Sequence, residues 1–192
     1  RPVGYHRSAE AKAILGEVVA GLQYVLQTQQ PVYVLTSSGT GAMEAAVTNL
    51  VAAGEKVILG TAGRWGERWR GILRAYGAEV VAVEAAPGDV VTPERLAEAL
   101  QQHSDAVAVF TTLCETSTGV GHDIAAFGQL VRNSRAVLVV DGISGIGAME
   151  CRMDAWGIDV LVTGSQKALM MPPGLAYIAV SPKGWQKIEA TP

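Results

Sequence analysis

The alternation of short apolar segments with helical patterns most limits the folds open to this chain. Apolar, largely β-branched runs occupy residues 32–35, 136–140 and 160–163, and segments with helical spacing separate such runs along the chain. Strands without a polar face are typical of a parallel sheet buried between two layers of helices. The sequence therefore predicts an α/β fold with three layers, α/β/α, around a mostly parallel sheet.

Start and stop signals give approximate bounds for the elements. Ser8 begins a first helix that Pro31 closes, and Thr92 with Pro93 begins another by capping. The predicted helices cover residues 8–29, 42–51, 64–76, 92–102 and 123–133, with a single turn at 153–156 and a closing helix from Trp185. The predicted strands cover residues 32–35, 56–59, 79–83, 106–110, 136–140, 160–163 and 175–180, with a turn at 60–63 and a polar loop at 111–121.

Two further expectations concern packing. The last strand follows Pro172-Pro173-Gly174 so directly that we expect it to pair antiparallel with a neighbour. The apolar positions of the first helix are expected in the core; they are Ile14, Val18, Leu22, Val25 and Leu26. No repeat or domain boundary is visible, so residues 1–192 are expected to form one domain.

Composition excludes several classes of protein. Hydrophobic residues make up 49% of the 192 residues and charged ones 17%, which is sufficient for a large core. The net charge of −3 and the absence of basic runs argue against nucleic acid or an anionic membrane as a partner. Apolar runs of about seven residues are too short to span a bilayer. Two cysteines are too few for a disulfide framework or a metal cluster. Because no signal peptide is visible, we expect a cytoplasmic protein. Because the first residue is Arg, we also expect a processed or trimmed piece.

A lysine follows the apolar run at 160–163 after three small or polar residues. Lys167 precedes Ala-Leu-Met-Met and then Pro172-Pro173, which cannot continue a helix, so the sequence predicts a tight connection there. Apolar neighbours such as Met170 and Met171 would desolvate the amine and lower its pKa. A nucleophilic amine of this kind is what a Schiff-base lysine requires. The alternative is an ordinary surface lysine at the end of a strand.

Other candidate residues also follow predicted strands. Ligands of such sheets bind beyond the carboxyl ends of the strands, where these residues are expected to gather. Ser38, Gly39 and Thr40 would begin a helix whose free N–H groups favour a phosphate. Three more predicted strands are followed by Asp141, by Trp65 and by the loop of Glu115, Thr116, Ser117 and Thr118. A phosphate cradle, an acid, a stacking ring and a lysine together fit pyridoxal phosphate, whose ring nitrogen a carboxylate keeps protonated.

Each of these residues has a structural alternative. The Ser-Gly-Thr segment and Asp141 also suit helix or turn caps, and Trp65 also suits core packing. The three histidines show no ligand spacing and are expected to be structural, and the thiol of Cys114 is expected to be incidental. The occurrence of all these candidates together at strand ends is stronger evidence for a cofactor site than any single residue.

The order of these motifs resembles a known family. Ser-Gly-Thr-Gly-Ala-Met-Glu at 38–44, Gly-Arg-Trp-Gly-Glu-Arg at 63–68 and Glu-Thr-Ser-Thr-Gly-Val at 115–120 are followed by Val-Asp-Gly-Ile-Ser at 140–144 and Gly-Ser-Gln-Lys-Ala at 164–168. Gly-Tyr-His-Arg-Ser at 4–8 and Pro-Pro-Gly at 172–174 complete the set. The chain resembles the class V, fold-type I pyridoxal-phosphate aminotransferases, being similar to alanine–glyoxylate and serine–glyoxylate (serine–pyruvate) aminotransferases and the cyanobacterial "soluble hydrogenase small subunit" proteins. The Ser-Gln-Lys context favours this branch over the desulfurases, whose lysine usually follows a histidine.

The resemblance implies a role for each candidate. Lys167 would form the Schiff base and move the substrate proton, and Asp141 would pair with the pyridine nitrogen. Trp65 would stack on the ring, and Thr116 would meet its phenolic oxygen. The phosphate would be held by Ser38, Gly39, Thr40 and Gln166; position 40 is often His in the animal enzymes, but Thr keeps a hydroxyl.

The resemblance also implies an aspartate aminotransferase-like large domain and a transaminase of alanine or serine with glyoxylate or pyruvate. The family's N-terminal segment would precede Arg1. Its small C-terminal domain, with the arginine that grips the substrate carboxylate, would follow Pro192. The family is dimeric, and the partner subunit completes the phosphate site, so a homodimer is expected.

Two other functions stay open. The piece could be an inert scaffold or non-catalytic subunit. A nucleotide oxidoreductase is disfavoured because Glu44 stands where the third glycine of the dinucleotide motif belongs.

Overall fold

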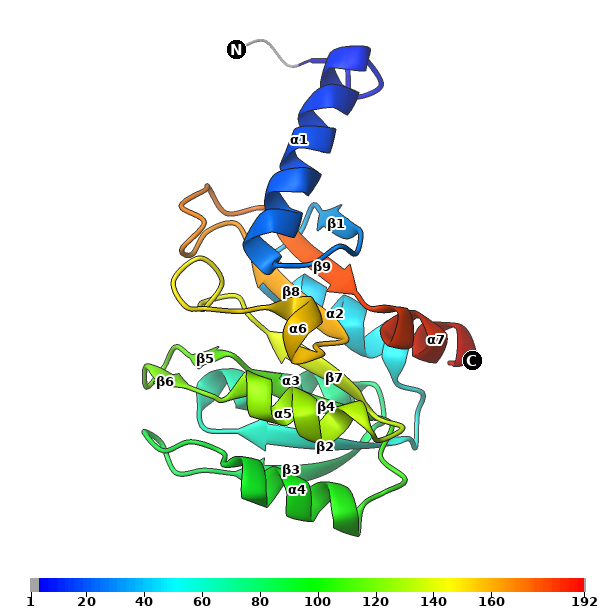
Figure 1. Ribbon diagram of the computed structural model, residues 1–192, viewed down its shortest axis with the longest axis vertical. Coiled ribbons are helices and arrows are strands. Elements are labelled where there is room, and N and C mark those ends of the chain that lie inside the picture. The colour runs from blue at the N-terminus through cyan, green and yellow to red at the C-terminus, as the bar shows by residue number, and fades with distance from the viewer. Residues whose placement is uncertain (1–3, 192) are drawn as a thin grey trace.

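A computed structural model describes residues 4–191, and Figure 1 shows helices on both sides of a central sheet. The helices are α1 (Ala9–Leu26), α2 (Gly39–Leu50), α3 (Arg64–Ala75), α4 (Pro93–Gln102), α5 (Ile124–Arg132), α6 (Met153–Trp156) and α7 (Pro182–Ala190). The strands are β1 (Val32–Leu35), β2 (Lys56–Thr61), β3 (Glu79–Glu84), β4 (Ala108–Thr112), β5 (Cys114–Glu115), β6 (Val120–Gly121), β7 (Val137–Asp141), β8 (Val160–Gly164) and β9 (Ala176–Val180).

Seven strands form the main sheet in the order β1-β9-β8-β7-β4-β2-β3. Strand β9 is antiparallel to both of its neighbours, and every other pairing in this sheet is parallel. The carboxyl ends of six strands therefore lie along one edge. This confirms the predicted α/β/α fold and the predicted antiparallel strand.

Two apolar clusters cover the two faces of the sheet. One joins β-strand side chains to α1, α4, α5 and α6, and the other joins them to α2, α3 and α7. Strands β4, β7 and β8 are buried along their whole length, because helices cover both faces. Burial on both faces explains why these strands are continuously apolar in the sequence.

Capping residues explain several helix boundaries. The side chains of Ser8, Thr92, Asp123 and Ser181 each accept a hydrogen bond from a backbone N–H of the first helical turn. Helix α1 ends at Leu26, because the following Gln27 has a left-handed backbone with φ of 53°, so the predicted end at Gln29 is three residues late. Helix α7 begins at Pro182, before the predicted Trp185, because Ser181 caps it.

The prediction that all apolar positions of α1 lie in the core is wrong. Leu22 and Leu26 are buried, whereas the exposed fractions of Ile14 and Val18 are 51% and 40%. Only the C-terminal part of α1 reaches the sheet; the rest projects beyond it at the top of Figure 1. Helical spacing identifies an apolar face but not what covers it.

Two predicted loops contain strand. Strand β2 continues to Thr61 through the predicted turn, and β4 reaches Thr112 before the hairpin of β5 and β6. Thr111 and Thr112 are fully buried and paired in register with β7. Polar composition misled the loop prediction, although threonine is β-branched and fits a strand.

Candidate active site

All eight site residues predicted from the sequence line one cavity at the carboxyl edge of the sheet. They follow or end five strands: β1, β2, β5, β7 and β8, of which β5 begins two residues after β4 ends. The cavity has a volume of ≈ 210 Å³ and is lined by Ser38, Gly39, Thr40, Trp65, Thr116, Asp141, Gln166 and Lys167, together with Ile143 and Ser144. The structure therefore brings the eight residues together, while their chemical roles stay predictions.

The first turn of α2 provides one wall of the cavity. Ser38 is the N-cap with an extended backbone, but its side chain makes no capping hydrogen bond. The first N–H groups of a helix have no intrahelical acceptor and carry its positive dipole end, so this wall suits an anion. A Cβ at Gly39 would lie 2.4 Å from Cδ1 of Ile143, which explains why glycine begins the helix here, earlier than the predicted Ala42.

Asp141 ends β7 at the base of the cavity. It pairs in register with Thr112 of β4 and Val162 of β8, and its side chain is buried. Burial raises the pKa of the Asp141 carboxyl to about 7, although a hydrogen bond from the backbone N–H of Ile143 to Oδ1 (2.8 Å) favours the ionised form. Within residues 4–191 only Oδ1 is hydrogen-bonded, so Oδ2 remains available to a ligand.

Lys167 lies in the connection that follows β8. Its carbonyl accepts a hydrogen bond from the N–H of Met170 (2.9 Å), consistent with the tight connection predicted. Lys167 is half-buried, and no carboxylate within residues 4–191 lies within ion-pair distance of it. Met170 and Met171, which were expected to desolvate the amine, are 89% and 54% exposed, so their side chains face solvent.

Ser165 fixes this connection, and sequence reasoning missed its role. Its Oγ donates to the carbonyl of Pro172 (2.6 Å), and its backbone N–H donates to the carbonyl of Leu175 (3.0 Å). Ser165 is fully buried. The loop that starts at Lys167 is thus closed at its base.

Trp65 provides another wall from the first turn of α3. Two guanidinium groups lie close to its ring: Cζ of Arg64 is 5.8 Å and Cζ of Arg68 is 5.6 Å from the ring centroid. Its backbone N–H donates to Oε2 of Glu115 (3.0 Å). The side chain is half-buried, so part of the indole is open to the cavity.

Thr116 and Gln166 complete the predicted set. The hydroxyl of Thr116 donates to Oγ of Ser144 (2.6 Å), which links the turn between β5 and β6 to the loop after β7. Gln166 is exposed at the rim. Ile143 and Ser144 were missed as lining residues; their signal was their position directly after the strand-ending Asp141.

Within residues 4–191, no titratable side chain other than Asp141 and Lys167 lines this cavity. His122 is buried, and its Nδ1 lies 2.9 Å from the carbonyl oxygen of Thr112, consistent with a structural role. Within residues 4–191 no group of three or more His, Cys, Asp and Glu is arranged to hold a metal ion. Across the same residues, no helix combines the length and apolar character that crossing a membrane requires.

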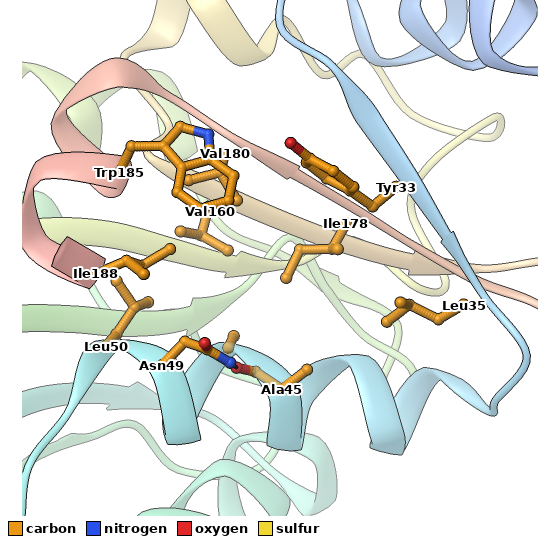
Figure 2. A pocket seen from close by; sticks show the side chains of 11 residues that line it. Tyr33, Leu35, Ala45, Asn49, Leu50, Val160, Ile178, Val180, Trp185 and Ile188 are labelled. Atoms are coloured by element: carbon orange, nitrogen blue, oxygen red, sulfur yellow. Dashed lines mark hydrogen bonds between the residues drawn. The ribbon is translucent and has the colours of Figure 1, made fainter. Parts of the chain in front are cut away.

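A second cavity, also of ≈ 210 Å³, lies on one face of the sheet between α2 and α7. Figure 2 shows Trp185 and Tyr33 on one side of it and Ala45 and Asn49 of α2 on the other. Its lining contains no carboxylate, amine, imidazole or thiol; the residues are Tyr33, Leu35, Ala45, Ala46, Asn49, Leu50, Val160, Ile178, Val180, Trp185 and Ile188. This cavity therefore offers no side chain for acid–base chemistry near neutral pH, whereas the first cavity offers Asp141 and Lys167.

Comparison with known proteins identifies the family of the chain. The family model for aminotransferase class-V matches residues 3–191. The chain belongs to the class-V aminotransferases. This confirms the resemblance that the motifs indicated.

Several relatives of this class-V aminotransferase chain have names that give an enzymatic activity or a subunit role. A "Soluble hydrogenase, small subunit" of Synechococcus sp. (strain PCC 6716) is 40% identical over 96% of this chain and 49% of the relative. An L-aspartate–glyoxylate aminotransferase of Paracoccus denitrificans is 40% identical over 96% of this chain and 48% of the relative. The crystal structure of an alanine–glyoxylate aminotransferase from Nostoc sp. superposes with a TM-score of 0.93 at 33% identity, covering 98% of this chain and 50% of that one. The chain thus spans about half the length of the relatives it matches.

Proposed function

We propose that this chain is the cofactor-binding large domain, residues 1–192, of a pyridoxal-phosphate-dependent transaminase. The enzyme would move an amino group from a small amino acid, alanine or serine, to a small 2-oxo acid such as glyoxylate or pyruvate. The observation that carries the proposal is the convergence of residues from five strand ends on one cavity in a class-V chain. Glyoxylate in the names of the Paracoccus and Nostoc relatives supports a small 2-oxo acid.

The cavity residues fit pyridoxal phosphate by chemistry. The uncapped first turn of α2, with the hydroxyls of Ser38 and Thr40, suits a phosphate, and Gln166 stands at the rim beside it. Oδ2 of Asp141 is free of hydrogen bonds within residues 4–191 and suits a ring N–H. The indole of Trp65 and the hydroxyl of Thr116 suit the face and the phenolic oxygen of a pyridine ring. When bound, the cofactor supplies an electron-accepting ring that stabilises negative charge at the substrate's α-carbon.

The roles of the side chains follow from their positions. Nζ of Lys167 would hold the cofactor covalently and, once released, take the proton from the α-carbon and return it as an acid. Asp141 would keep the proton on the ring nitrogen, because its carboxylate is fixed by Ile143 at the end of a rigid strand. Trp65 would orient the ring and exclude water from one face. We further propose a cytoplasmic homodimer, as in the family that the motifs resemble.

Cofactor binding to lysine variants tests the proposal. Pyridoxal phosphate should give the full-length protein the absorption band of a lysine-bound cofactor, and Lys167→Ala should lack that band. Lys183→Ala is the matched control, because Lys183 is also half-buried but follows β9 at the opposite edge of the sheet. An identical band in Lys167→Ala and wild type would exclude Lys167 as the attachment site. A screen of amino donors and 2-oxo acids then identifies the substrates.

A second candidate is a non-catalytic subunit, favoured by the name of the Synechococcus relative. Such a protein would bind the cofactor weakly or not at all. Titration of the full-length protein with pyridoxal phosphate separates the two functions, because only the transaminase requires saturable binding that depends on Lys167.

A further inference from the structure

Glu115 is a fully buried carboxylate beside the cavity that no role described above requires. Its Oε2 accepts hydrogen bonds from the backbone N–H groups of Trp65 (3.0 Å) and Gly66 (3.1 Å). Its Oε1 accepts from the N–H (3.1 Å) and Oγ (2.6 Å) of Ser117. One side chain therefore joins the first turn of α3 to the turn between β5 and β6.

The chemistry of this position specifies a carboxylate. Both oxygens face donors, and Oε2 also lies at the positive dipole end of α3. Within residues 4–191, Glu115 has no lysine, arginine or histidine at ion-pair distance, so these donors are its compensation for burial. A glutamine of the same size would turn an NH₂ group toward N–H donors on one side or the other.

Two glycines allow the approach of α3 to this carboxylate. A Cβ at Gly63 would lie 2.9 Å from Cγ and Cδ of Glu115. A Cβ at Gly66 would lie 2.8 Å from the Cα of Thr61 in β2. The first turn of α3 is thus held between the Glu115 side chain and the end of β2, with Trp65 between the two glycines.

The residues that Glu115 connects are neighbours of the cavity walls. Trp65 is itself bonded to Glu115, and Thr116 follows it directly and bonds Ser144 across the cavity edge (2.6 Å). We propose that Glu115 is a positioning residue that fixes the indole of Trp65, and with it the Thr116 turn, in the geometry needed to hold the cofactor ring. This inference rests on the proposed function.

The substitution Glu115→Gln tests the inference. Asp159→Asn is the matched control: Asp159 is also buried, and its carboxylate accepts from the N–H of Leu138 (2.9 Å) and the Oγ of Ser181 (2.6 Å), at the opposite edge of the same sheet. We expect Glu115→Gln to weaken the binding of pyridoxal phosphate to the full-length protein roughly tenfold, and Asp159→Asn to leave it within about twofold of wild type. Visible circular dichroism per bound cofactor, which reports ring orientation, should change only in Glu115→Gln.

A second readout needs no cofactor. Protein labelled with 5-fluorotryptophan should give a fluorine signal that Trp65→Phe removes. That signal should shift or broaden in Glu115→Gln and stay unchanged in Asp159→Asn. If Glu115→Gln does not fold, Ser117→Ala removes one of the four donors to Glu115, together with the acceptor of the Arg64 N–H (3.2 Å), and should move the same signals in the same direction by less.

The outcomes separate the two claims. If the Trp65 signal is unchanged in the folded Glu115 or Ser117 variant and cofactor affinity matches that of Asp159→Asn, the positioning role is overturned. If wild type and Lys167→Ala both lack a lysine-bound cofactor, the proposed function and the cofactor part of this inference fall together. The fluorine signal still decides whether Glu115 places Trp65.

Discussion

Asp141 and Lys167 line the same cavity, yet the carboxyl is buried at the end of a strand and the amine lies half-exposed in a loop. Burial raises the pKa of Asp141 to about 7; the hydrogen bond from Ile143 and the positive charge of Lys167 act against this, and the negative charge of Glu115 adds to it. The balance leaves Asp141 able to exchange a proton near neutral pH.

This raised pKa predicts a specific pH dependence of stability. The folded protein binds a proton at Asp141 more tightly than the unfolded chain does, so the contribution of Asp141 is fully present below its ordinary pKa of 3.8 and is lost as the pH rises through about 7. The loss should be up to about 4 kcal/mol of unfolding free energy. Urea unfolding of the cofactor-free protein between pH 4 and 8 should show this decline, and Asp141→Asn should lack it. Parallel curves for the two proteins would contradict the assignment.

A second substitution at Asp141 tests its proposed role toward the cofactor. Asp141→Ala should keep the absorption band of the lysine-bound cofactor, because Lys167 is unchanged, but should lose most of the turnover. The loss is expected because an unprotonated ring nitrogen accepts electrons poorly. Turnover is measured with the best donor and acceptor pair from the substrate screen. Wild-type turnover in this variant would remove the role of Asp141.

Two glycines of α3 should respond to alanine in opposite directions. A Cβ at Gly66 would lie 2.1 Å from Oγ1 and 2.8 Å from the Cα of Thr61, so Gly66→Ala should destabilise the protein by about 1–3 kcal/mol. Gly71 is the matched control in the same helix, with no atom within 4 Å of its added Cβ. Gly71→Ala should stabilise by about 0.5–1 kcal/mol, since glycine is unfavourable within a helix. Thermal unfolding compares them, and equal shifts would contradict the packing of α3.

The loop after Lys167 contains a residue with unfavourable backbone geometry. Met170 has φ of 54° and is 89% exposed, so glycine should relieve its left-handed conformation without loss of packing. Met170→Gly should raise the free energy of unfolding by up to about 1 kcal/mol. The neighbouring Met171 lacks a positive φ, so Met171→Gly should lower it instead. A fall in both variants would argue against the left-handed conformation at Met170.

Much of the site was predictable because each strand end is a local signal. Ser38, Trp65, Asp141 and Lys167 were identified by following apolar runs to the polar residue beyond them, and parallel strands bring such residues to one edge. Glu115 was named only as part of a loop. Its bonds to Trp65 and Gly66 join residues 50 and 49 positions apart, which no local pattern reports.

The periodicity of the sequence by itself determined the type of most elements, the layered α/β/α fold and the residues that follow each strand, because these depend on neighbours along the chain. Only the tertiary structure decided how deeply Asp141 is buried, that Met170 faces solvent and that the N-terminal part of α1 projects beyond the sheet. These properties depend on which distant segments cover a side chain. The solvation of a side chain sets its pKa and decides whether it belongs to the core, and solvation depends on the residues that surround the side chain in three dimensions.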